Sequence, residues 1–128
     1  MNFLLDTHAL IWWILDSGPL TVAARIAISD LKNQIYVSAA TAWEITIKYR
    51  LGKLPQAAPF ATRIKASLEE LSFIELPITV DHAQRAGLLP GGHKDPFDRL
   101  LIAQAQAENL VLISNERVFD NYGIRRLW

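Results

Sequence analysis

The chain has 128 residues, enough for one compact domain with a core of its own. Its 13 Lys and Arg balance its 13 Asp and Glu, so no overall positive charge indicates nucleic-acid binding, which would have to come from local patches. The absence of cysteine excludes a disulfide scaffold and thiol chemistry. Because Asp6 and His8 interrupt a short apolar N-terminal run, we expect a cytoplasmic protein without a membrane segment.

Strands and helices alternate along the chain. The first apolar run stops at Asp6, Thr21 and Thr79 are suited to capping helices, Gly52 is suited to ending one, and Pro96 is suited to a first helical turn. We expect strands at residues 2–6, 35–38, 73–77, 110–114 and, as a possible fifth, 124–128. We expect helices at residues 7–15, 22–32, 39–52, 60–71, 79–90 and 96–109.

This alternation predicts a single α/β domain over residues 1–128. Its central parallel sheet has four to five strands and helices on both faces. In such sheets ligands bind beyond the carboxyl ends of the strands, so that edge is where functional residues are sought.

Two acids stand at the start of the predicted helix 96–109. Asp95 precedes Pro96 and is best interpreted as the helix cap, while Asp98 falls at the third helical position. Asp98 shares a face with Leu101, Ile102 and Ala105, and the opposite side of the helix is also apolar. We therefore expect a helix buried all round, with Asp98 directed toward the sheet edge.

Glu44 lies on an apolar face of the predicted helix 39–52. A carboxylate there costs several kcal/mol unless it is paired, protonated or bound to metal. The alternative is a surface pair with Lys48, four residues on, which contributes about 0.3–0.5 kcal/mol and does not require Glu44 to point inward. The other members of the face are Ala40, Ile47 and Leu51, with Trp43 at its border.

Asp6 and Glu116 follow the first and fourth predicted strands. Asp6 is interpreted either as a helix cap or as a site residue, and Glu116, two residues after Ser114, taken alone fits an ordinary strand-to-helix turn. In a parallel sheet, however, Asp6, Glu44, Asp98 and Glu116 all approach one edge. Their mutual repulsion would be relieved by a hard cation such as Mg²⁺ or Mn²⁺. The histidines have no zinc-like spacing, and each is expected on the surface or in a loop: His8, His82 and His93.

Four segments in this order resemble the PIN domain, and within it the VapC-type toxins of bacterial toxin–antitoxin pairs. They are "LLDT" at 4–7, "AWEI" at 42–45, "DPFDRLLIAQA" at 95–105 and the closing "LVLISNERVFDNYGIRRLW". The resemblance implies an endoribonuclease with an acidic pocket for Mg²⁺ or Mn²⁺, a cognate antitoxin as partner, and a homodimer. It implies catalytic roles for Asp6, Glu44, Asp98 and Glu116, metal binding by the first three, and support from Asp95, Ser114 and Thr7. Glu116 departs from the family's usual Asp, and its longer reach implies either action through water or loose binding.

RNA also needs positive charge near such a pocket. Candidates for phosphate contacts are Lys48, Arg50, Lys53, Lys94 and Arg99, although any one of them is equally suited to a solvated helix face or loop. No pattern in the sequence reads bases. Trp12 and Trp13 are adjacent in the first helix, so either one of them is exposed as a partner surface or both are covered by neighbouring helices.

Two other functions compete with the nuclease. A phosphoacceptor signalling domain should have paired acids after its first strand and a Lys after a late strand, but "LLDTHAL" has one acid and "LISNE" has no Lys. The second alternative is a non-catalytic nucleic-acid or partner-binding module that retains the PIN fold. Acids at all four places argue against it, and Glu116 in place of Asp keeps it open.

Overall fold

A five-stranded sheet in the order β3-β2-β1-β4-β5 forms the centre of the computed structural model, which describes residues 1–128. All four pairings are parallel, so the predicted parallel sheet is confirmed, including its fifth strand. β1 lies in the middle, with Phe3 paired to Ile35 on one side and to Val111 on the other. The strands are β1 (Asn2–Leu5), β2 (Gln34–Ser38), β3 (Ile74–Leu76), β4 (Val111–Ile113) and β5 (Arg126–Leu127).

The helices follow the predicted alternation. Thr21, Thr79 and Asp95 each cap the helix that the sequence assigned to them. No helix is both long and apolar enough to cross a bilayer. The α-helices are α1 (Thr7–Leu15), α2 (Val22–Ser29), α3 (Ala39–Arg50), α4 (Ala58–Ala61), α5 (Ile64–Glu70), α6 (Val80–Leu88) and α7 (Pro96–Glu108), with 3₁₀ turns η1 (Pro55–Ala57) and η2 (Arg117–Tyr122).

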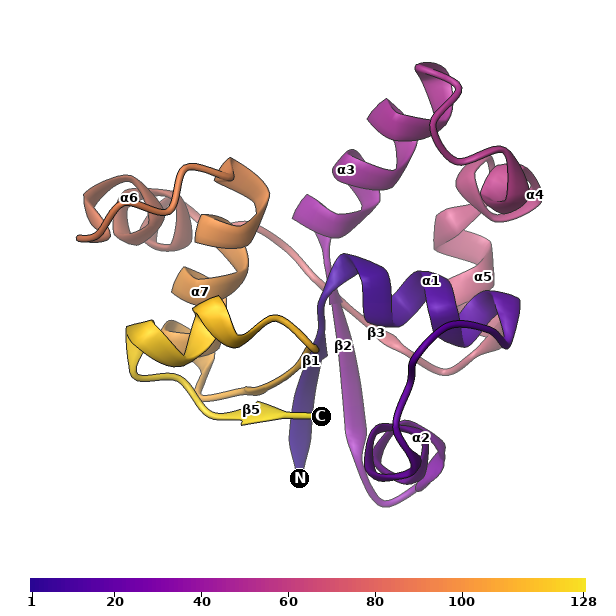
Figure 1. Ribbon diagram of the computed structural model, residues 1–128, viewed down its shortest axis with the longest axis horizontal. Coiled ribbons are helices and arrows are strands. Elements are labelled where there is room, and N and C mark those ends of the chain that lie inside the picture. Colours follow the sequence, from indigo (N-terminus) through magenta and orange to yellow (C-terminus); the bar gives the residue numbers. More distant parts are fainter.

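Side chains of the strands alternate between two hydrophobic cores. Phe3 and Leu5 of β1 point into a core shared with α1, α2, α4 and α5, whereas Leu4 between them points into a core formed with α7 and η2. Figure 1 shows this arrangement: α6 and α7 on one side of the sheet, α1, α2 and α5 on the other. Because β1 and β2 run parallel, the helices that follow them, α1 and α3, both begin at the carboxyl edge of the sheet.

The predicted helix at 60–71 is wrong as one element. The structure has two short helices instead, α4 and α5, separated at Thr62 and Arg63. The Thr62 hydroxyl donates to the carbonyls of Ala58 and Pro59, a local bond that competes with helix continuation. The backbone of Arg63 then leaves the helical region, with φ −147° and ψ 42°.

Two expectations about burial also need correction. Only the middle of α7, from Leu101 to Ala105, is buried, and Gln106 and Glu108 are exposed, so this helix is not buried all round. His82 lies neither on the surface nor in a loop: it is buried in the first turn of α6, where its Nδ1 accepts the Thr79 amide and completes a capping box.

Candidate functional site

Asp6 lies where β1 ends and α1 begins. Its Oδ1 accepts a 2.7 Å hydrogen bond from the Ala9 amide, which confirms the capping interpretation. The side chain is also buried, and the Ser114 hydroxyl at the end of β4 hydrogen-bonds to it. Burial raises the pKa of Asp6 from 3.8 to about 6, although both hydrogen bonds oppose the rise. Asp6 therefore combines a capping role with the properties of a desolvated acid at the sheet edge.

Glu44 of α3 is buried and held at both carboxylate oxygens. Oε1 accepts the Thr7 hydroxyl at 2.6 Å, and Oε2 accepts the Lys48 ammonium group at 2.7 Å. Both interpretations of Glu44 therefore apply together, because it pairs with Lys48 and still points inward. The apolar face expected around it is incomplete, since Ile47 is half-buried and Leu51 is exposed.

Asp95 and Asp98 differ in their contacts. Asp95 Oδ1 accepts the amides of Phe97 and Asp98 at 2.9 and 3.2 Å, so its capping role is confirmed. Asp98 Oδ2 instead lies 2.8 Å from His93 Nε2. Burial raises the pKa of Asp98 from 3.8 to about 6; the His93 hydrogen bond opposes this, and the charges of Asp95 and Glu116 add to it.

Glu116 acts on two of the other acids through its charge. Its charge raises the pKa of both Asp6 and Asp98, although burial is the larger cause in each case. Its Oε1 is 3.9 Å from Nδ1 of His8, and its backbone amide donates to the Ser114 hydroxyl oxygen. Asp6 follows β1, Glu116 comes after β4 and Asp98 lies in α7, and the charge of Glu116 acts on both aspartates.

The acids have the chemistry of a site for a hard cation, but their side chains are not arranged as ligands. No group of three or more His, Cys, Asp or Glu side chains has a geometry that holds a metal ion. The expected set of Asp6, Glu44 and Asp98 is therefore not assembled in this conformation. The donors are nevertheless all carboxylate oxygens, which Mg²⁺ and Mn²⁺ prefer, and repulsion among them is what a cation would relieve.

The basic residues divide into two groups. Lys48 is bound to Glu44, and the Arg99 guanidinium donates to backbone carbonyls of Ala86, Leu89 and His93 at 3.0, 2.6 and 3.0 Å. The expected phosphate contact of Arg99 is not supported, because its donors are engaged within the protein. The candidates that remain exposed are Arg50, Lys53 and Lys94.

The exposed tryptophan near the site is Trp43. Trp12 and Trp13 are both half-buried against the larger core, which is the second of the two alternatives for that pair. The Trp43 side chain, in contrast, is 59% exposed and makes an edge contact with Phe97, ring centres 5.3 Å apart. Phe97 precedes Asp98, so this aromatic pair borders the acidic edge.

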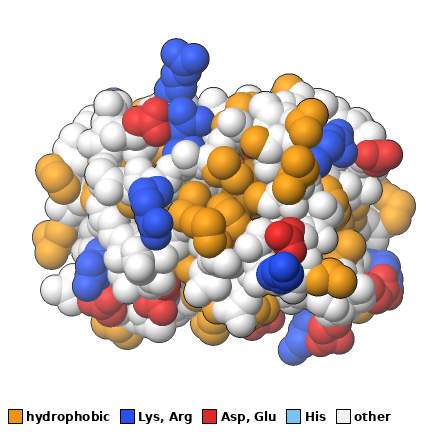
Figure 2. Space-filling model, turned by 90° about the horizontal axis from the view of Figure 1, so that it is seen from below, with side chains coloured by type: hydrophobic (Ala, Val, Ile, Leu, Met, Phe, Trp, Pro, Cys, Tyr) orange, Lys and Arg blue, Asp and Glu red, His pale blue; other side chains and the backbone are white.

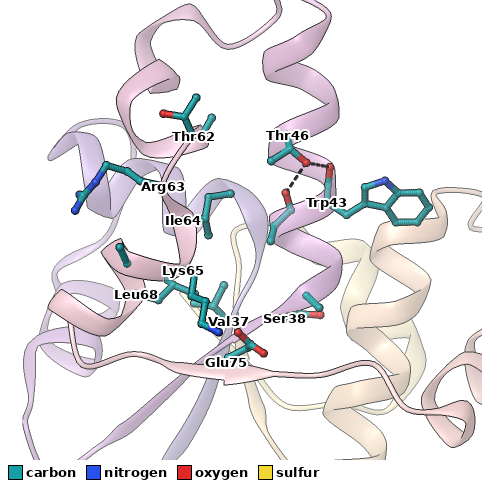
Figure 3. Close-up of a pocket in the computed structure, with 14 residues that line it drawn as sticks. Val37, Ser38, Trp43, Thr46, Thr62, Arg63, Ile64, Lys65, Leu68 and Glu75 are labelled. Atoms are coloured by element: carbon teal, nitrogen blue, oxygen red, sulfur yellow. Dashed lines mark hydrogen bonds between the residues drawn. The ribbon is translucent and has the colours of Figure 1, made fainter.

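A separate hollow of about 670 Å³ lies between α3 and α5. Figure 3 shows Ile64 and Lys65 of α5 facing Val37 and Glu75, while the Trp43 indole points away from them. The hollow is lined by none of the four acids, Asp6, Glu44, Asp98 and Glu116. It is therefore distinct from the acidic edge.

The side of the molecule seen in Figure 2 has no continuous field of one charge. Lys and Arg side chains alternate there with Asp and Glu around a group of hydrophobic side chains. This view is from below Figure 1, the side on which the N-terminus lies. A strong electrostatic attraction for RNA is therefore not expected on this face.

The sequence interpretation missed His93 as a neighbour of Asp98. The available signal was its place in the "GGHKDP" loop, five residues before Asp98 and two residues before the capping Asp95. It also missed that Thr7 holds Glu44, which links α1 to α3. Both contacts join residues across a loop or between elements, where periodicity gives no information.

A comparison with known families assigns the fold. The model of the PIN domain matches residues 3–124. The chain belongs to the PIN-domain family. The phosphoacceptor alternative therefore has no support. Within this PIN domain, 62 residues are 44% identical to Ribonuclease VapC16 of Mycobacterium tuberculosis (strain ATCC 25618 / H37Rv), a match that covers 48% of this chain and 43% of that protein.

Solved structures share the PIN-domain fold over nearly its whole length. VapBC2 from Rickettsia felis, bound to a DNA fragment from its promoter, has a TM-score of 0.73 at 17% identity and covers 99% of this chain and 98% of that one. VapC20 of Mycobacterium tuberculosis, described as a Sarcin-Ricin loop cleaving toxin, has a TM-score of 0.70 at 16% identity, with 95% of both chains covered. At these identities the likeness concerns the fold alone.

Proposed function

We propose that this PIN domain is a metal-dependent endoribonuclease and the toxin of a toxin–antitoxin pair. The observation that carries the proposal is that burial, together with the charge of Glu116, raises the pKa of both Asp6 and Asp98. The ribonuclease named among its relatives supports the same reaction class. RNA is the proposed substrate, a cognate antitoxin the proposed partner, and a homodimer the proposed assembly.

The proposed roles follow from the contacts of each acid. Asp6 and Asp98 hold Mg²⁺ or Mn²⁺ together with Glu44, whose oxygens keep a lone pair each beside the bonds to Thr7 and Lys48. The ion supplies an activated water and offsets phosphate charge. Glu116 orients water at the same edge, and Ser114 fixes the turn that carries it.

RNA is held near these acids by basic residues that are not paired with any of them. Arg50 and Lys94 are exposed and contribute phosphate contacts. Lys48 acts on Glu44 rather than on RNA, since its ammonium group is 2.7 Å from that carboxylate.

The first test is cleavage itself. Purified protein freed of any antitoxin should cut RNA in Mg²⁺ or Mn²⁺ and stop when EDTA removes the ion.

A binding module that retains the fold is the second candidate, favoured by the lack of an assembled ligand set. This second candidate is supported if the folded protein binds RNA but does not cleave broad RNA pools in the presence of several metal ions.

The second test separates the two neighbouring aspartates. Asp95→Ser keeps a capping oxygen for the Phe97 and Asp98 amides, so Mn²⁺ affinity should change little and part of the turnover should remain. Asp98→Ser should lose Mn²⁺ binding and cleavage together. Calorimetric titration of Mn²⁺ into each variant measures the difference. Binding lost in Asp95→Ser and retained in Asp98→Ser would mean that the ligand is assigned one helical turn too late.

A further inference from the structure

The loop between α6 and α7 is tied to the first turn of α7 by Arg99. Its guanidinium donates to the carbonyls of Ala86 and Leu89 at the end of α6 and to the carbonyl of His93 in the loop. A planar fork with several donors is suited to holding carbonyls that a helix end leaves without partners. The position of His93 is therefore fixed by α7, the same helix that carries Asp98.

The His93 ring is held by its surroundings as well. Nε2 lies 2.8 Å from Oδ2 of Asp98, and the ring makes an edge contact with Phe119, ring centres 6.5 Å apart. The side chains of His93 and Asp98 are only 21% and 18% exposed. Together with the Arg99 bond to its own carbonyl, these contacts leave His93 little freedom to move.

The bond from His93 is not needed to cap α7. Asp95 already accepts the free amides of Phe97 and Asp98. The other two buried acids have holding partners on nearby helices or strands: Thr7 and Lys48 for Glu44, and Ala9 for Asp6. For Asp98 this partner is a loop histidine, whose ring packs against Phe119 and whose Nε2 meets the carboxylate.

We propose that His93 is the positioning residue of Asp98: its Nε2–H donates to Oδ2 and directs the remaining carboxylate lone pairs toward the cation. This rests on the proposed metal-dependent function. Partners that hold a ligand are typically worth about 10–100-fold in metal affinity or activity. His93 itself is not assigned a contact with RNA or metal.

The test compares variants that separate the donor from the ring. His93→Phe keeps an aromatic ring against Phe119 and removes the donor; His93→Ala is a second donor-free variant without added bulk. His93→Gln restores an N–H donor at the end of a side chain of similar reach. Gln84→Ala, on the exposed side of α6, is the matched control.

The first measurement is Mn²⁺ binding to chelator-treated protein by calorimetry. Affinity should fall about tenfold or more in His93→Phe and His93→Ala, return to within about threefold in His93→Gln, and be unchanged in Gln84→Ala. At saturating Mn²⁺, kcat for RNA should fall in the donor-free variants while KM for RNA stays the same.

Two results overturn the proposal while leaving the proposed function intact. If the wild-type protein binds Mn²⁺ and cuts RNA, but the donor-free variants do so equally well, His93 only packs. If His93→Gln is as weak as His93→Phe, the ring and not the donor matters. A wild-type protein that neither binds Mn²⁺ nor cleaves RNA refutes the proposed function, and the role of His93 with it.

Discussion

Asp6 and Asp98 differ from ordinary surface carboxylates because burial favours their protonated forms. The pKa of each rises from 3.8 to about 6. For Asp98 the rise in pKa corresponds to a free-energy cost of roughly 3 kcal/mol for ionising the carboxyl group in the folded state. Solvent reaches this half-buried group, so the actual cost is smaller. The charge of Asp98 thus opposes folding at neutral pH, which is the behaviour expected of a side chain retained for chemistry.

Asp98→Asn should abolish cleavage and keep the fold. The variant removes the desolvated charge and retains an oxygen that accepts the His93 bond, so we expect the free energy of unfolding of metal-free protein to rise by about 1 kcal/mol. Urea denaturation and an RNA cleavage assay measure the two effects. A loss of stability greater than about 1 kcal/mol would instead identify Asp98 as a structural residue.

The stability of metal-free protein should fall as pH rises from about 4 to about 6. In that range the folded state holds protons on Asp6 and Asp98 that the unfolded state has released, so the free energy of unfolding decreases with pH, by at most about 1.4 kcal/mol per pH unit for each group. Above about 6 this contribution levels off. Denaturation curves across the range, compared with an Asp6→Asn, Asp98→Asn double variant, isolate the effect; equal slopes in both proteins would contradict it.

For single residues, the sequence predicts those contacts that join residues close together along the chain. Asp95 before Pro96 is identifiable as a cap, and the structure confirms it. The contact of His93 with Asp98 could not be predicted, because it depends on how Arg99 shapes the intervening loop. Likewise the sequence offered pairing or inward burial for Glu44, but a helix can satisfy both when Lys48 reaches along its surface.

At the scale of elements, Arg99 joins α6, its following loop and α7. Arg99→Lys keeps the charge and loses the fork, so several carbonyls of α6 and the loop lose their donor. We expect about 2 kcal/mol of lost stability in urea denaturation. Since Arg99 is not assigned a phosphate contact, the salt dependence of RNA binding should stay the same.

Two variants, Arg50→Ala and Lys94→Ala, should have the opposite effects to Arg99→Lys. Both residues are exposed, so their loss should leave stability within about 0.5 kcal/mol. Each should weaken RNA binding and reduce the salt slope by about 1. A reduced slope in Arg99→Lys, with unchanged slopes in these two variants, would reverse the assignment.

Element boundaries could be predicted where a strong local signal exists. Asp6 and Leu15 bound α1 as expected, and Thr79 begins α6. The break at Thr62 and Arg63 was missed because both halves, α4 and α5, bury apolar side chains at helical spacing, so periodicity runs straight through it.

For the whole molecule, Mn²⁺ should act as a stabilising ligand. Binding to the folded state alone adds RT ln(1 + [L]/Kd), about 2.7 kcal/mol at a hundred times Kd. The melting temperature should rise with Mn²⁺ in the wild-type protein and not in Asp98→Asn, as scanning calorimetry would measure. An equal rise in both would indicate that Mn²⁺ binds elsewhere.

The central position of β1 has a consequence for biosynthesis. Its residues are synthesised long before those of β4, but Phe3 must pair with Val111 of β4. Such distant pairing makes folding slow, and it cannot begin until the ribosome has released β4. Asp6 therefore comes near Glu116 only after β4 has been synthesised. A nascent or prematurely terminated product carries its first acid without the last, so on the proposed function it is harmless to the RNA that surrounds it during translation.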